Sequence, residues 1–174
     1  MIVPAATGAR VSIAPTVHEL LDYTADQFRR WERWFAAHPA ALDLPFGSGR
    51  LASVRDVVHH IVGVERRYTD RLLGRPATPY ENVPKAPIGA LFAEWRGARA
   101  QLERWIAWAS DADLAQRLSF TTMSAGVQEA SARKIVGHVL LHGIRTWAQL
   151  ATVVRQAGHP TDWPHDLLFT DALD

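Results

Sequence analysis

The chain has 174 residues, of which 48% are hydrophobic and 21% are charged, a composition typical of a folded globular protein. A chain of this length forms one domain of ordinary size, so we expect a single domain over residues 1–174. The formal net charge of +1 provides no electrostatic attraction to nucleic acid or to an anionic membrane, and we expect neither as a partner. The lack of cysteine excludes disulfides, thiolate metal ligands and a cysteine nucleophile.

The distribution of apolar residues argues against export and against membrane insertion. No segment reaches the ~18 consecutive apolar residues that a membrane-spanning helix needs. The first residues, Met1 to Pro15, contain one arginine and no long apolar run, so we do not expect a secretory signal. The sequence therefore predicts a cytoplasmic protein.

The first predicted helix runs from about Thr16 to Ala37. Thr16 and Glu19 have the spacing of a capping box, in which each side chain binds a free backbone amide at the start of the helix. Apolar residues then recur every three or four positions, which gives this helix one apolar face. Pro39 ends the helix, because proline disfavours helical backbone in the residue before it.

The next two predicted helices are separated by a proline-rich linker. One runs from about Ser53 to Leu73, with Ser53 as its N-cap and Gly74 just beyond its end. The other runs from about Ile88 to Ala109. The linker of roughly fourteen residues is long for a plain antiparallel turn, so it could instead cross the bundle.

The last part of the chain changes pattern before it returns to helix. Apolar and polar residues alternate over a few positions on either side of Met123–Gly126, within residues 118–129, which predicts a short hairpin. The fourth helix is predicted from about Ser131 to Ala157, and Gly158 follows it as a stop signal. Four amphipathic helices of about twenty residues predict an all-α fold, an antiparallel four-helix bundle with a long connection between the second and third helices.

Four of the eight histidines lie within predicted helices, and helical periodicity distinguishes their positions. His60 shares a face with apolar neighbours and is expected to point inward, whereas His59 has polar neighbours and is expected to point outward or into a groove. His138 and His142 are four residues apart, so both rings project from one side of the last helix and could chelate one ion. A structural role in the core is the alternative for such a pair.

Several other residues are candidates for the lining of a pocket or for the core. We expect most of the seven tryptophans to fill the core. Tyr68, Arg145 and Gln149 are candidate polar residues of a pocket, and we expect Glu65 and Arg66 to form a solvated face.

Three stretches of the sequence resemble the DinB/YfiT-like family of four-helix bundles, which are regarded as metal proteins. They are Leu20–Phe28, Val57–Glu65 and His138–Gly158, and the resemblance covers most of the chain from about Thr16. The last stretch is the most specific, because its spacing fits the final helix of the family without a gap. The resemblance implies the helical fold, and we also expect the protein to form a homodimer.

The resemblance also implies a site of three histidines for a divalent metal (zinc, nickel or iron). His60, followed by an aliphatic residue, matches the ligand on the second helix, and His142 matches the first of two ligands spaced HxxxH on the last helix. The third ligand falls at position 146, where this sequence has Thr146. A hydroxyl is a poor ligand for a divalent transition metal, so we expect binding to be weak or absent.

Three outcomes remain open for the predicted metal site of His60, His142 and His138. The protein has lost its affinity for metal, or it binds weakly through two histidines and water, or His138 completes an alternative site one turn earlier. Two functions follow. The first, which the resemblance implies, is a metal-dependent enzyme that acts on a small-molecule substrate with a low-molecular-weight thiol; a bound cation would favour deprotonation of the coordinated thiol. Alternatively, the chain is a non-catalytic bundle that binds a small molecule or a protein.

Overall fold

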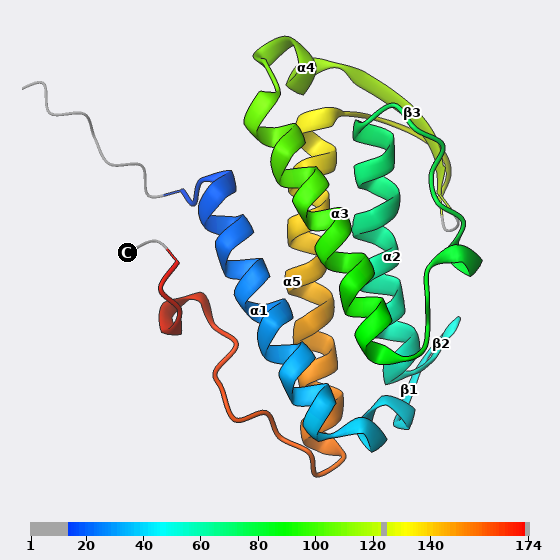
Figure 1. Ribbon diagram of the computed structural model, residues 1–174, viewed down its shortest axis with the longest axis vertical. Helices are drawn as coiled ribbons and strands as arrows, with labels where there is room; N and C mark the ends of the chain where they lie inside the picture. The colour runs from blue at the N-terminus through cyan, green and yellow to red at the C-terminus, as the bar shows by residue number, and fades with distance from the viewer. Residues whose placement is uncertain (1–13, 123–124, 173–174) are drawn as a thin grey trace, which may run out of the picture.

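The computed structural model describes residues 14–122 and 125–172, most of which are helical (Figure 1). The four long helices are α1 (Val17–Ala37), α2 (Val54–Leu72), α3 (Ile88–Trp108) and α5 (Ala132–Gln156). Each bound lies within one residue of the position predicted from the sequence. The prediction of a mostly helical fold is confirmed.

Capping side chains explain where the long helices begin. The Thr16 hydroxyl accepts a hydrogen bond from the Glu19 amide, and the Glu19 carboxylate accepts one from the Thr16 amide. Ser53 and Asp56 form the same reciprocal pair at the start of α2. Gly74 follows α2 with a positive φ of 67°, a backbone conformation that favours glycine.

The four long helices pack so that α1 lies against α3 and α5, and α2 lies against the same two helices. In Figure 1, α1 and α5 run in one direction, and α2 and α3 run in the other. The parallel course of α2 and α3 requires the connecting linker, residues 73–87, to return along the length of α2. This 19-residue helix is about 28 Å long, which explains the length of the linker.

Two small hairpins, one short α-helix and three short 3₁₀ helices (Pro39–Asp43, Tyr80–Asn82 and Leu167–Phe169) complete the described elements. The predicted hairpin is present as β3 (Arg117–Thr122) and β4 (Gly126–Ser131), which pair antiparallel. Residues 123–124 of its predicted turn lie outside the described residues. So do residues 1–13, the part of the chain in which we expect no secretory signal. The sequence did not predict the hairpin of β1 (Pro45–Ser48) and β2 (Leu51–Ser53), nor α4 (Asp111–Ala115).

The core consists of two apolar clusters with a buried polar layer between them along all four long helices. The first cluster includes Phe28, Val58, Phe92 and Leu150, and the second includes Leu21, Leu72, Leu102 and Leu140. On each helix, the buried polar residues fall between these two sets in the sequence. They are Thr24 and Gln27 on α1, Glu65, Thr69 and Asp70 on α2, Arg99 on α3, and His142 and Thr146 on α5.

The expectation that Glu65 lies on a solvated face is wrong. Its side chain is 3% exposed and forms an ion pair with Arg99, whose Nε lies 2.6 Å from Glu65 Oε1. The indole of Trp95 donates a second hydrogen bond to the same carboxylate. A helical carboxylate is normally solvated, but α3 presents a guanidinium and an indole to this one.

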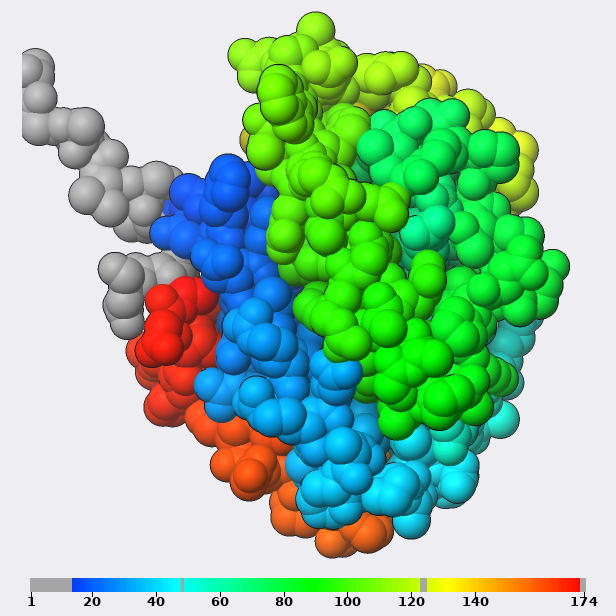
Figure 2. Space-filling view, in the orientation of Figure 1, coloured from blue at the N-terminus to red at the C-terminus, as the bar shows by residue number. Residues whose placement is uncertain are grey.

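The segment after α5 packs back onto α1 (Figures 1 and 2). Trp163 is buried, and its indole donates a hydrogen bond to the Gln27 side chain at 3.3 Å. Five of the seven tryptophans are buried as expected, whereas Trp108 at the end of α3 is 86% exposed. Within the described part of the chain, no helix combines the length and the apolar character that a bilayer crossing requires.

Candidate functional site

Two histidines from opposite helices meet at the edge of the buried polar layer. His60 on α2 and His142 on α5 have their Nε2 atoms 3.1 Å apart, and their ring centroids are 5.0 Å apart. His142 is 8% exposed, and His60 is partly buried. His59 instead places its Nε2 atom 3.1 Å from the Val83 carbonyl oxygen, on the linker. Helical periodicity therefore assigned the inward and outward histidines of α2 correctly.

Both histidines of this pair are held in the neutral form. Burial, with smaller contributions from the nearby His60, His138 and Arg145, lowers the pKa of His142 to about 3. Burial also lowers the pKa of His60, with smaller contributions from His59 and Arg145. At neutral pH one ring donates its single N–H to the other, so the pair forms a neutral hydrogen bond.

His138 lies on the same side of α5, one turn before His142. Its ring centroid is 5.6 Å from that of His142, and its ring packs edge-on against Tyr68 at 5.1 Å. The His138 side chain is exposed. Across residues 14–122 and 125–172, no group of three histidine, aspartate or glutamate side chains is close enough to hold a metal ion.

Thr146 lies one turn after His142 and is 3% exposed. Its hydroxyl donates a hydrogen bond to the backbone carbonyl of His142 at 2.7 Å. The hydroxyl proton is therefore engaged within α5. Thr146 contributes to the buried polar layer as a side chain that satisfies the backbone of its own helix.

The histidine pair lines a cavity of about 1040 Å³ that is bounded by α2, α5, the linker and both hairpins, β1–β2 and β3–β4. The candidate pocket residues Tyr68 and Arg145 line it, whereas Gln149 is exposed and does not. The sequence did not indicate the other polar residues of the wall. Those that matter most are Arg67 and Arg71 on α2 and Tyr80 on the linker.

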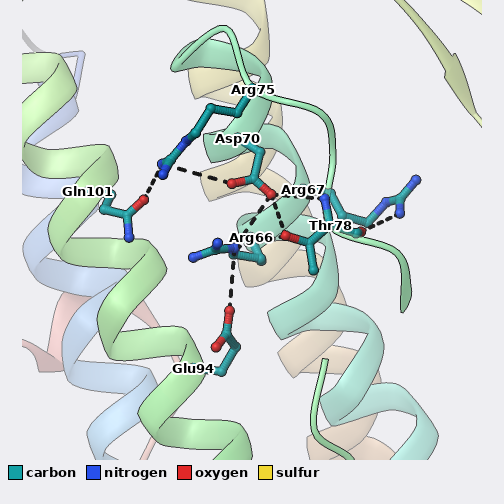
Figure 3. A network of polar contacts seen from close by, with 7 residues as sticks. All are labelled: Arg66, Arg67, Asp70, Arg75, Thr78, Glu94 and Gln101. Atoms are coloured by element: carbon teal, nitrogen blue, oxygen red, sulfur yellow. Dashed lines mark hydrogen bonds and ion pairs between the residues drawn. The ribbon is translucent and has the colours of Figure 1, made fainter. Parts of the chain in front are cut away.

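The linker is fixed to α2 by a polar network around Asp70 (Figure 3). The Asp70 carboxylate accepts hydrogen bonds from the backbone amide and the hydroxyl of Thr78, at 3.0 and 2.6 Å. Arg66 lies 3.4 Å from the same carboxylate and also donates to Thr78. Arg67 donates to the Thr78 carbonyl at 2.6 Å. These contacts hold the wall of the cavity that the linker contributes.

Tyr80 closes that wall against α2. Its ring lies over Gly63, where a Cβ atom would overlap the ring carbons of Tyr80. The ring also stacks near His60, with centroids 6.2 Å apart, and the Arg67 guanidinium lies 4.7 Å from its centroid. Glycine in the middle of a helix thus has a packing role here, which the sequence alone does not reveal.

The fold and the site place the chain in a class of helical bundles that carry histidines on facing helices. The sequence pattern of the DinB family matches residues 10–172, nearly the whole chain. The chain belongs to the DinB family, as the resemblance indicated. No curated protein gives a significant match to it.

The donor atoms of this chain do not fit the three-histidine metal site that the family resemblance implies. Two imidazole nitrogens 3.1 Å apart could both reach one ion at about 2.1 Å, with an angle of about 95° at the ion. A metal-bound histidine, however, normally donates its other ring N–H to an acceptor, and the buried Nδ1 of His142 has no partner among the described residues. Thr146 stands in place of the third imidazole.

Proposed function

We propose that the chain is a DinB-type four-helix bundle that binds a small organic molecule in the cavity above the histidine pair. The observation that carries this proposal is the cavity itself, about 1040 Å³ in volume, with the neutral His60–His142 pair in its wall. Small-molecule sites are typically concave, of about 300–1,000 Å³, and combine apolar walls with a few polar groups. His60 and His142 would then serve as hydrogen-bonding groups for the ligand.

An NMR titration tests this proposal directly. We use phenylnaphthylamine, a neutral aromatic probe, and follow the imidazole and backbone resonances of α2 and α5. We expect saturable shifts centred on His60 and His142, and we expect His159, beyond the end of α5, to be unaffected. Shifts that do not saturate, or that map away from the cavity, would contradict the proposal.

A second candidate is a metal-dependent enzyme that acts on a small-molecule substrate with a low-molecular-weight thiol. The 3.1 Å separation of the two Nε2 atoms favours it, because this distance is compatible with a shared ion. The third protein ligand is the missing element. The predicted site of His60, His142 and His138 requires the exposed His138 ring to move toward the pair.

The substitution Thr146→His distinguishes the two candidates. Positions 142 and 146 are one helical turn apart, so the new imidazole would complete the HxxxH pair of the family pattern. We expect added zinc or nickel to raise the melting temperature of the variant by several degrees and to change that of the parent little, because a ligand stabilises the state that binds it.

Two results would contradict these expectations. If untagged parent protein retains one equivalent of metal through dialysis against a chelator, the expectation of weak or absent metal binding is wrong, and His138 or a carboxylate must complete the site. If the variant gains no affinity, residue 146 does not occupy the ligand position. The homodimer and the cytoplasmic location stay predictions, and sedimentation equilibrium checks the first.

A further inference from the structure

One cation of the cavity wall, Arg71, is half-buried without a counter-ion. Its guanidinium lies 4.7 Å from the centroid of Tyr68 and 5.0 Å from that of Phe120, and it donates a long hydrogen bond of 3.4 Å to the Thr121 carbonyl. Among the residues that the structure describes, it forms no ion pair. Burial lowers the pKa of Arg71 and the positive charge of Arg67 lowers it further, against smaller opposing contributions from Tyr68, Tyr80 and Asp70. This position therefore disfavours the charge that the side chain carries.

Arg67 and Arg71 are four residues apart on α2, and both line the cavity. Like charges at this spacing on a helix repel each other. The nearest carboxylate on the same helix, Asp70, is engaged by Thr78, Arg66 and Arg75 (Figure 3). The local structure thus leaves two neighbouring guanidiniums facing one cavity without a carboxylate of their own.

The side chains that line the whole cavity also carry a net positive charge. Five cationic side chains and two carboxylates line it, and one of those carboxylates, Asp56, is bound to Lys85 at 2.5 Å. Arg145, near the histidine pair, makes neither a hydrogen bond nor an ion pair with any described residue. The remaining carboxylate, Glu81, is exposed. A cavity of this composition attracts anions and concentrates them.

We propose that the cavity recognises an organic anion whose carboxylate or phosphate group is bound between Arg67 and Arg71, with its body directed toward Tyr68 and the histidine pair. Guanidinium groups bind both kinds of oxyanion through paired N–H donors. The aromatic rings of Tyr68, Phe120 and Tyr80 hold the two arginines in place, so little side-chain freedom is lost on binding. This inference rests on the proposed small-molecule site and adds the charge of the ligand.

A matched pair of fluorescent probes tests the inference. Anilinonaphthalene sulfonate carries an anionic group on an aromatic body, and phenylnaphthylamine has the same body without the sulfonate. We expect the parent protein to bind the sulfonate more tightly. The substitution Arg71→Met keeps the aliphatic stem between the two rings but removes the charge. We expect it to weaken sulfonate binding about tenfold, the loss of one charge-assisted contact, and to leave the neutral probe unchanged.

The control is Arg104→Met, which removes an exposed arginine of α3 that does not line the cavity. We expect it to change neither affinity, and circular dichroism checks that both variants are folded. Equal binding of the two probes by the parent, or an equal loss of both in Arg71→Met, would overturn the inference and leave the small-molecule site standing. If neither probe binds, the proposed function fails with it.

Displacement of the bound sulfonate identifies the anionic group. Benzoate, phenyl phosphate and benzyl alcohol share a similar aromatic body and differ in the group attached to it. We expect benzoate or phenyl phosphate to displace the probe, and the more effective of the two names the preferred oxyanion. Displacement by benzyl alcohol at the same concentration as both anions would show that charge is not recognised.

Discussion

Glu65 and Arg99 form a buried ion pair whose surroundings satisfy both charges. Arg99 donates to both oxygens of the carboxylate, and its remaining nitrogen donates to the Leu21 carbonyl and to the Thr24 hydroxyl. Trp95 donates to the carboxylate from the same helix as Arg99. The pair therefore joins α2 and α3 to α1. Such a pair contributes little net stability relative to an apolar one, but the loss of either partner leaves an unpaired buried charge.

We predict that Glu65→Gln lowers the free energy of unfolding by about 3–5 kcal/mol, because the Arg99 charge then lacks a buried counter-ion. The matched control is Glu32→Gln, which breaks the exposed contact between Glu32 and Arg96, also on α3. That substitution should lower the free energy of unfolding by at most ~1 kcal/mol. Urea denaturation of both variants measures the difference, and equal losses would contradict the role given to the buried pair.

His142 should make the stability of the fold depend on pH. Its pKa is about 3 in the folded chain and about 6.5 in the unfolded chain, so the unfolded state binds more protons between these values. The resulting stability is fully present above pH 6.5 and is lost as the pH falls toward 3. The loss per pH unit in this window is about 1.4 kcal/mol for one such group.

We predict that the free energy of unfolding of His142→Gln falls less steeply between pH 6.5 and pH 4 than that of the parent. His60, His138 and His165 also have lowered pKa values, so the variant keeps part of the slope. Denaturation is measured with a chelator present, which removes any contribution from metal. Identical slopes for parent and variant would show that His142 is accessible to protons in the folded state.

Only some of the functional and buried polar residues could be predicted from the sequence. Helical periodicity was sufficient to predict that His60 and His142 point inward, because the buried face of a helix can be recognised from apolar neighbours three and four residues away on the same helix. Glu65 and Arg71 were not identified, because their environments are created by residues far away in the chain, Arg99 in one case and Phe120 in the other. No pattern within α2 distinguishes a buried carboxylate with a partner from a solvated one.

At the scale of elements, the linker between α2 and α3 is the part of the chain that shapes the cavity. Helix ends were predictable because Thr16, Ser53 and Gly74 act through their own backbone neighbours. The path of the linker was not predictable, because it depends on two contacts between the linker and α2: Tyr80 with Gly63, and Thr78 with Asp70. The β1–β2 hairpin was missed because its strands are only four and three residues long.

We predict that Gly63→Ala destabilises the chain although alanine favours helix by about 1 kcal/mol over glycine. The added methyl group overlaps the Tyr80 ring, and such overpacking costs about 1–3 kcal/mol. The control is Gly97→Ala on α3, where nothing lies within 4 Å of the new Cβ, and it should raise stability by about 0.5–1 kcal/mol. Thermal denaturation compares them. The inference fails if Gly63→Ala is as stabilising as its control.

At the scale of the whole molecule, the segment after α5 belongs to the first of the two apolar clusters. Trp163 belongs to the same cluster as Trp31 on α1, Val58 on α2 and Trp147 on α5. Its ring packs edge-on against Trp31, with centroids 5.3 Å apart. The Tyr23 hydroxyl donates to the His165 carbonyl at 2.5 Å, so polar contacts also hold this segment on α1. We therefore expect the segment to unfold together with the bundle.

The substitution Trp163→Ala tests this cooperativity. Removal of a buried tryptophan leaves a cavity in the cluster and should lower the free energy of unfolding by about 3–5 kcal/mol. Leu168→Ala, in the same segment but at a side chain that is 85% exposed, should change it by less than about 0.5 kcal/mol. Hydrogen exchange supplies the second measurement: in Trp163→Ala, we expect the slowest amides of α1 and α5 to exchange faster. If only the amides of residues 159–172 exchange faster while the helices keep their protection, the segment detaches by itself. The expected cooperativity would then be wrong, and the four-helix bundle would be stable without the packed segment after α5.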